Sequence, residues 1–247
     1  MKERLKIIAD SVNRGESMAD IGTDHGFLPI FLLNEGICER AIATDISEAA
    51  IAKTREYSTD ALKRGNLSLR CGSGIEVLEK GEVDIVVIAG MGGVLIAQIL
   101  GIDPAKTISF SRFILQPRKG TGKLRTWLAV NGFHTEDIRI MREGSHYCEI
   151  MTVIPPRSID EFTGVTYMGQ RMKSGGIECD FPPSFAENAD PLMRDYIKLN
   201  LIKELRVLEN LGLGADLPLE RLEIARSRVQ YMENLLNSWI EKNQREE

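Results

Sequence analysis

The stretch AIATDISEAAIAKTREY, residues 41–57, changes its hydrophobic periodicity in the middle. Residues 41–44 form a short run without any charge, which is typical of a buried strand. The run stops at Asp45, and from Ser47 onward the apolar residues recur at helical spacing, with Ser47 as the expected N-cap. The stretch therefore predicts a buried strand that leads directly into a helix.

This strand–helix unit recurs along the first half of the chain. Strand-like runs occupy residues 17–22, 39–45, 67–72, 83–90 and 112–117. Helical patterns follow them at residues 25–36, 47–65, 74–81, 94–102 and 121–132, and a further helix is expected at residues 4–13. Alternation of this kind predicts an α/β fold in which helices cover both faces of a parallel sheet.

The pattern changes after Gly132. Residues 133–155 contain two strand-like runs around REGSH (142–146) with no helix between them, which predicts an antiparallel hairpin. A plain dinucleotide-binding domain would instead continue in strand–helix units. The hairpin therefore indicates the seven-stranded, Rossmann-like sheet of class I methyltransferases.

The remaining residues predict a second, helical domain. Pro155 and Pro156 interrupt the pattern, and residues 157–190 are rich in loop-forming residues. Two long helical segments follow, and the second carries apolar residues at heptad spacing: Leu222, Ala225, Val229, Met232, Leu236 and Trp239. The turn GLGADLP (212–218) lets the segments fold back into an antiparallel helical hairpin, a coiled coil. We expect one domain at residues 1–155 and another at residues 156–247.

The composition excludes several classes of protein. Of the 247 residues, 43% are apolar and 27% charged, as in ordinary globular proteins. No apolar run approaches the ~18 residues of a membrane span, and the N-terminus lacks the apolar core of a signal peptide, so we expect a cytoplasmic protein. The four cysteines form no CxxC pair and the three histidines lack ligand spacing, so no metal site is expected.

One segment departs from the net charge of −5. Between Asp103 and Glu136 the chain has no acidic residue. The same interval carries six basic residues: Lys106, Arg112, Arg118, Lys119, Lys123 and Arg125. Such a segment is either a local binding surface for phosphates or a solvated helix face.

Four unusual sequence features follow the first four predicted strands. They are DIGTDHG (20–26), Asp45, CGSG (71–74) and AGMGG (89–93). The first has GxxxG spacing and lacks the GxGxxG pattern of dinucleotide binders. Because the carboxyl ends of parallel strands meet at one edge of a sheet, where open α/β sheets bind ligands, the four features predict a ligand site there.

Asp45 has two interpretations. It caps the following helix, or it accepts hydrogen bonds from the two hydroxyl groups of a ribose, as acidic residues at this place do in nucleotide-binding sheets. Ser47 competes for the cap position, which favours the ribose interpretation.

The order of these motifs resembles the class I S-adenosylmethionine-dependent methyltransferases. More narrowly, MADIGTDHGFLPIFLL, VDIVVIAGMGGVLI, FILQPRKGTGKLRTWLAVNGF and HYCEIMTVI resemble the TrmK family. The resemblance covers residues 1–155 closely, and the C-terminal helices resemble that family's coiled-coil domain in character. It implies methylation of N1 of adenine 22 in bacterial tRNA, with S-adenosyl-L-methionine as the cofactor and tRNA as the partner.

The resemblance also implies the site residues. Asp24 is the expected catalytic residue, because a carboxylate there would stabilise positive charge on the methylated adenine; the alternative is that Asp24 caps the next helix. The expected cofactor-binding residues are Asp20, Gly22, Thr23, Gly26, Asp45, Ile46, Gly72, Ser73, Gly74, Ala89, Gly90, Met91 and Gly92. The expected substrate-binding residues are His25, Arg118, Lys119, Lys123 and Arg125. Ser73 and Arg118 depart from the family pattern, which has an acidic residue and an asparagine at those positions.

Three alternatives remain open at this stage. A class I methyltransferase that acts on another RNA site or on a small molecule has the same cofactor motifs. A non-catalytic RNA-binding protein with a retained methyltransferase fold does not need the intact Asp20, Gly22 and Asp45. A dehydrogenase is disfavoured by the GxxxG spacing and by the terminal hairpin.

Overall fold

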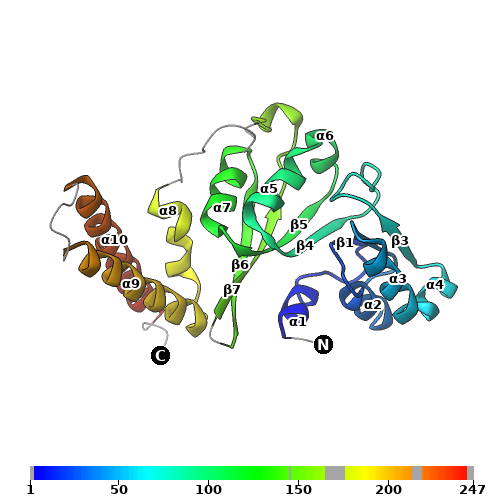
Figure 1. Cartoon of the computed structure of the whole chain (residues 1–247), viewed down its shortest axis with the longest axis horizontal. Coiled ribbons are helices and arrows are strands. Elements are labelled where there is room, and N and C mark those ends of the chain that lie inside the picture. Colours follow the sequence, from blue (N-terminus) through cyan, green and yellow to red (C-terminus); the bar gives the residue numbers. More distant parts are fainter. Residues whose placement is uncertain (1–2, 145, 165–175, 213–218, 244–247) are drawn as a thin grey trace. The chain divides into compact units, whose positions relative to one another are not determined.

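The computed structural model describes residues 3–144, 146–164, 176–212 and 219–243. Its first part is a seven-stranded sheet in the order β3-β2-β1-β4-β5-β7-β6 (Figure 1). The strands are β1 (Met18–Ile21), β2 (Ala41–Asp45), β3 (Leu67–Cys71), β4 (Ile85–Gly92), β5 (Arg112–Lys119), β6 (His134–Glu143) and β7 (His146–Ile154). The paired strands from β3 to β5 are parallel, and β7 is antiparallel to β5. The predicted seven-stranded methyltransferase sheet is confirmed.

Helices connect the strands and cover the sheet. They are α1 (Glu3–Ala9), α2 (Phe27–Asn34), α3 (Glu48–Tyr57), α4 (Thr59–Arg64), α5 (Gly93–Gly101), α6 (Pro104–Thr107) and α7 (Thr121–Val130). On one face, buried residues of α1, α2 and α4 share a core with Ile85 and Val87 of β4. On the other face, α5 packs against α7, whose Trp127 contacts the ring of Phe133. The sheet is thus buried on both faces, which explains its mostly apolar strands.

The structure corrects two predicted helices. Residues 74–81 form turns, because Gly74 and Gly81 both adopt left-handed backbone, with φ angles of 52° and 63°. The single helix expected over residues 47–65 is broken at Ser58 into α3 and α4.

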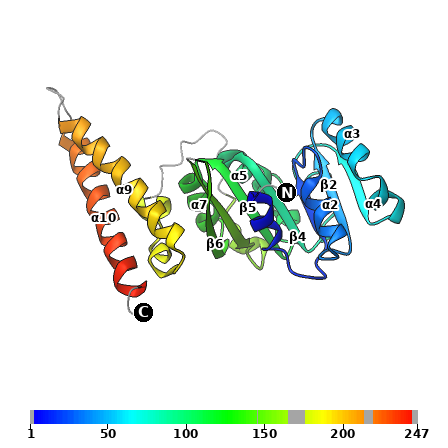
Figure 2. The same cartoon turned by 90° about the horizontal axis from the view of Figure 1, so that it is seen from below.

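The C-terminal segment is helical. It contains the short η1 (Ile159–Glu161), α8 (Ile177–Asp180) and η2 (Pro183–Glu187), then α9 (Pro191–Gly212) and α10 (Leu219–Asn243). The last two pack along each other in opposite directions, as Figure 2 shows. Ala225, Val229 and Met232 are buried as the heptad pattern predicts, and Leu235 is more buried than the predicted Leu236. The predicted turn at residues 212–218 lies largely outside the described residues.

Contacts divide the chain into two compact units. The first comprises Met1–Glu143 and Cys148–Lys173, and the second comprises Gly144–Tyr147 and Ser174–Glu247. The tip of the β6–β7 hairpin therefore groups with the helical unit, where the Tyr147 ring lies 5.7 Å from that of Tyr196. The division into domains at residue 155 stays a prediction.

No helix among the described residues has both the length and the apolar character that crossing a membrane requires. No three histidine, cysteine, aspartate or glutamate side chains among them are grouped as a metal ion would require.

Candidate active site

The turn between β1 and α2, residues 22–26, uses backbone conformations that favour glycine. Gly22 and Gly26 have φ angles of 76° and 70°. Asp24 lies between them with a φ of 55° and is the one non-glycine residue with a positive φ in the described part of the chain. Such a conformation costs about 1–3 kcal/mol and persists where the surroundings enforce it, often at functional sites. The turn therefore holds Asp24 in a strained and well-defined conformation.

Close packing ties this turn to the neighbouring elements. A Cβ atom on Gly22 would lie 2.4 Å from Met91 Cε at the end of β4. A Cβ atom on Gly26 would lie 2.4 Å from Thr54 Cγ2 in α3. The backbone N–H of Gly22 also donates to the carbonyl of Thr44 in β2 at 2.8 Å. The ends of β1, β2 and β4 therefore meet at residues that the sequence predicts to bind the cofactor.

Asp45 connects the turn to the start of α3. Its Oδ1 accepts from the backbone N–H of Ser47 at 2.9 Å, and its Oδ2 accepts from that of Asp24 at 3.2 Å. Ser47 is the N-cap of α3, as predicted, and its hydroxyl accepts from Ala50 N–H at 3.4 Å. Asp45 is therefore not the cap residue. Each of its carboxylate oxygens has a further lone pair, enough to accept a ribose hydroxyl.

Asp20 is the buried carboxyl group of the site. Its pKa is raised to about 6, chiefly by burial; the hydrogen bond from Thr23 lowers the pKa, and the neighbouring Asp45 charge adds to the increase. The Thr23 hydroxyl donates to Asp20 Oδ2 at 2.7 Å. A carboxyl group at the end of β1 with a shifted pKa is the kind of group that marks ligand sites, although internal hydrogen-bond networks produce it too.

The Asp24 carboxylate is exposed, whereas the Asp24 backbone is fixed by a hydrogen bond. The side chain is 73% exposed, and its Oδ2 lies 2.8 Å from His25 Nδ1. The Asp24 carbonyl accepts from the Thr54 hydroxyl at 3.2 Å. The contact with His25 leaves Oδ1 available to a substrate donor.

A cavity of about 670 Å³ opens beside this turn. This volume lies in the range of small-molecule sites, which is about 300–1,000 Å³. The predicted site residues that line it are Asp20, Gly22, Thr23, Asp24, His25 and Ala89.

The same cavity is lined by Arg4 of α1, which sequence reasoning missed. Its Nε atom is buried without a hydrogen-bond partner, and its NH1 lies 3.9 Å from Glu143 Oε2. Burial raises the pKa of the Cys148 thiol, as does the Glu143 charge, while the charges of Arg4 and Arg118 oppose the increase. Arg4 and Arg118 therefore both lie near Cys148. The charged residues of the first helix follow no motif, so the sequence gives no signal that places Arg4 at the cavity. Arg4 lies there because of the tertiary fold.

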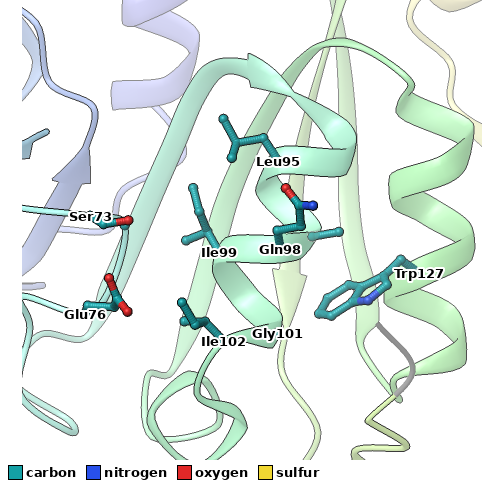
Figure 3. A pocket seen from close by; sticks show the side chains of 10 residues that line it. Ser73, Glu76, Leu95, Gln98, Ile99, Gly101, Ile102 and Trp127 are labelled. Atoms are coloured by element: carbon teal, nitrogen blue, oxygen red, sulfur yellow. The ribbon is translucent and has the colours of Figure 1, made fainter. Parts of the chain in front are cut away.

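Ser73 and Gly74 line a second, smaller cavity of about 260 Å³. Figure 3 shows Ser73 and Glu76 on one side of it, facing Ile99 and Ile102 of α5, with Trp127 of α7 on the other side. The preceding residue, Gly72, packs closely on Val77, because a Cβ atom on it would lie 2.2 Å from Val77 Cγ1. Ser73 and Gly74 line this cavity and are not among the residues that line the one beside Asp24.

The end of β4 is irregular where it reaches the site. Its pairing with β5 shifts register between Ala89 and Met91 and again between Met91 and Gly92. Gly90 has a φ of 78°, and its N–H donates to the buried side chain of Gln116 at 3.1 Å. Bulges of this kind redirect a strand end and are common beside active sites.

Ile46, the residue after Asp45, is 77% exposed. An apolar side chain so exposed at this edge of the sheet is available to pack against a ligand ring.

The predicted basic residues fall into two groups. Arg118, Lys119 and Lys123 are exposed. Arg125 is 8% exposed and forms an ion pair with the buried Glu149, which disfavours contact with a phosphate, and its role in substrate binding stays a prediction. Two other residues of the basic interval also have protein partners: Lys106 donates to the Glu76 carbonyl, and Arg112 pairs with Glu16.

Comparison with known proteins adds an independent line of argument. Residues 1–151 match the model of the methyltransferase domain family. Over 151 residues the chain is 34% identical to the tRNA (adenine(22)-N(1))-methyltransferase of Bacillus subtilis. The match covers 61% of this chain and 63% of the relative, so it spans less than two thirds of the relative's length.

Solved structures resemble the chain over most of its length. The B. subtilis m1A22 tRNA methyltransferase TrmK is 26% identical, with 96% of this chain and 98% of that chain covered and a TM-score of 0.78. The Streptococcus pneumoniae protein Sp1610, in complex with S-adenosyl-L-methionine, is 25% identical, with 96% and 99% covered and a TM-score of 0.77. With more than half of its residues matched by the family model, the chain belongs to the methyltransferase domain family.

Proposed function

We propose that this chain transfers the methyl group of S-adenosyl-L-methionine to N1 of adenine 22 in tRNA. A relative named for that activity is 34% identical to this chain over 151 residues. The observation that carries the proposal is the exposed Asp24 carboxylate, held in a strained turn at the edge of the sheet where open α/β sheets bind ligands. We propose the division into a methyltransferase domain at residues 1–155 and a helical domain at residues 156–247, and a cytoplasmic location.

The residues at the strand ends fit the parts of the proposed cofactor. Asp45 has acceptor capacity for the ribose hydroxyls, and the exposed Ile46 next to it packs on the adenine. Gly90, on which an added Cβ atom would meet nothing within 4 Å, leaves the backbone open to the amino acid portion. When bound, this cofactor supplies an electrophilic methyl group on a sulfonium.

The proposed chemistry needs no general base. N1 of adenine carries an in-plane lone pair at neutral pH, which attacks the methyl carbon while the bond from that carbon to sulfur breaks. The adenine becomes cationic, and the sulfur becomes the neutral thioether of S-adenosylhomocysteine. The protein therefore contributes in-line positioning and stabilisation of positive charge.

In our proposal, Asp24 stabilises the positive charge that develops on the adenine. Its free Oδ1 accepts a hydrogen bond from the N6 amino group of the target adenine, which favours charge on the ring. His25 holds the other oxygen, at 2.8 Å, and so fixes the orientation of the carboxylate.

The tRNA is held by charges near this edge. A target base inside folded RNA has to be extruded first, at a cost of a few kcal/mol. Arg118 and Lys119 at the end of β5, with Lys123 in α7, are exposed for phosphate contacts, and Arg4 adds a charge at the cavity wall.

The proposal is tested by separating cofactor binding from methyl transfer. S-adenosylhomocysteine is expected to raise the melting temperature, whereas NAD is expected to have no effect, because a ligand selective for the folded state stabilises it. Labelled methyl groups should then appear in tRNA and not in a mixture of free nucleosides. Stabilisation by NAD alone contradicts the family chemistry, and cofactor binding without labelling of any tRNA contradicts the substrate.

A further inference from the structure

Three aromatic rings form a connected group beside the candidate active site. The His25 and Phe27 rings are stacked, with centroids 5.4 Å apart and planes 4° from parallel. Tyr57, at the C-terminal end of α3, lies 6.3 Å from the His25 ring and 6.1 Å from the Phe27 ring. We call these three residues the aromatic cluster.

The aromatic cluster is exposed to a degree that packing does not explain. Phe27 is 54% exposed and Tyr57 is 62% exposed. Both belong to helices whose other apolar side chains are mostly buried, such as Leu28 and Ile51. Large apolar side chains that gather on a surface commonly mark a site of interaction.

The position of the aromatic cluster specifies what it would bind. His25 and Phe27 line the cavity that contains Asp24, whereas Tyr57 lies on the side away from that cavity. His25 Nδ1 also contacts the Asp24 carboxylate at 2.8 Å. The cluster therefore extends from the cavity that contains Asp24 out to the surface.

We propose that Phe27 and Tyr57 form a stacking surface for an unpaired base next to the target adenine in the tRNA chain. This proposal rests on the proposed function and adds a second nucleotide-binding position to it. Proteins that recognise single-stranded RNA stack splayed bases on aromatic side chains, because every base has a face available for stacking. Such contacts select for an unpaired neighbour and not for a particular base.

The surface also explains how the extruded target is retained. Pulling one base out of a helix removes its stacking on both neighbours, which costs a few kcal/mol. A neighbouring base that stacks on Phe27 and Tyr57 recovers part of this loss in the bound state. The ring of His25, fixed by Asp24, connects this position with the site of methyl transfer.

The first test removes the rings one at a time in the full-length chain. Phe27→Ala and Tyr57→Ala should each weaken tRNA binding about tenfold at a fixed salt concentration. Phe27→Tyr and Tyr57→Phe retain an aromatic face and should bind tRNA within about twofold of the wild type. The affinity for S-adenosylhomocysteine should be unchanged in all four variants, which checks folding and the cofactor site.

Ile159→Ala provides the matched control. Ile159 is 49% exposed, similar to Phe27, but it lies in η1 and not at the cavity, so this variant should bind tRNA as the wild type does.

The second test uses tRNA transcripts with an abasic nucleotide on either side of the target. One of the two abasic sites should weaken binding to the wild type about tenfold, but should weaken binding to Tyr57→Ala much less, since the partner ring is already absent. Additive losses, or wild-type affinity in the alanine variants, would overturn the stacking surface. If the wild type methylates tRNA in these experiments, the proposed function stands even when the stacking proposal fails; if it methylates no tRNA, the proposed function itself has failed.

Discussion

Asp24 is the residue on which the proposed chemistry depends, and Asp24→Asn tests it with little disturbance. Asparagine tolerates the left-handed backbone that Asp24 adopts, so the turn should persist. The amide lacks the negative charge that stabilises the methylated adenine, so kcat should fall about 10²-fold or more. Single-turnover rates with tRNA measure this fall, and binding assays with cofactor and tRNA serve as controls.

An Asp24→Ala variant extends that experiment. It removes the hydrogen bond to adenine N6 as well as the charge. Near-normal turnover in a variant that still binds both cofactor and tRNA would contradict the role of Asp24.

The buried Asp20 predicts a specific dependence of stability on pH. Its pKa is about 6 in the folded protein and 3.8 as an isolated group, so the folded state binds this proton more tightly. The resulting stabilisation is complete below the lower value and is lost as the pH rises through the upper one. Relative to the wild type, Asp20→Asn should therefore gain up to about 3 kcal/mol in free energy of unfolding from pH 4 to pH 7. Urea unfolding at several pH values measures this difference, and a flat difference would show that Asp20 titrates normally.

At the residue scale, the sequence predicts where a side chain lies when a local pattern determines its position. It does not predict the position of a side chain that is placed by tertiary packing. Ser47 as a cap follows from the strand-to-helix change, and the structure agrees. Arg125 carries a charge in a basic run, but its helical position turns it toward Glu149 in the interior. Arg4 lies at the cavity because α1 packs on the sheet, and no local sequence pattern predicts this position.

At the element scale, the Arg125–Glu149 ion pair connects α7 to β7. Both side chains are buried, at 8% and 3% exposed. Glu149→Ala leaves a buried guanidinium without that carboxylate, and the free energy of unfolding should fall by about 3–5 kcal/mol. Chemical denaturation measures the change.

The exposed pair Arg139–Asp137 in β6 is the control for this experiment. Its side chains are 43% and 42% exposed, so Asp137→Ala should cost less than about 1 kcal/mol. Equal effects of the two substitutions would contradict the importance of burial at Glu149.

The strands could be predicted to within a few residues because each is a short apolar run between turn signals. The turns at residues 74–81 could not be predicted in the same way. The apolar residues there have helical spacing, but two glycines with positive φ make the segment form turns and not a helix. The break at Ser58 has no proline or glycine to mark it, and Ser58 is 2% exposed, so tertiary packing decides it.

At the scale of the whole molecule, the order of strands in the sheet determines which strand ends meet at the candidate site. The chain runs from β1 outward through β2 to β3, then crosses back to place β4 on the other side of β1, so the ends of β1 and β4 lie side by side. Alternating strands and helices predict a parallel sheet, and the closing hairpin predicts its antiparallel end. The exposure of Phe27 and Tyr57 could not be predicted, because it depends on what the neighbouring elements leave uncovered.

The net charge of −5 implies that tRNA binding depends on few charges. The slope of log K against log salt should therefore be modest, and replacing Arg118, Lys119 and Lys123 together by alanine should reduce it by about 2–3. The control replaces Lys63 and Lys80 by alanine. These residues precede β3 and β4 and so lie toward the amino ends of the strands, away from the candidate site, and their replacement should leave the slope nearly unchanged. A slope unchanged in the triple variant would mean that the phosphates lie elsewhere.

The most direct test of the central claim locates the methyl group. Purified protein is incubated with S-adenosyl-L-methionine and unmodified tRNA transcripts that carry adenine or guanine at position 22, and the nucleosides are analysed by mass spectrometry. We predict 1-methyladenosine in the adenine transcript and none in the guanine transcript. Equal amounts of 1-methyladenosine in both transcripts, or none in either despite bound cofactor, would contradict methylation of adenine 22.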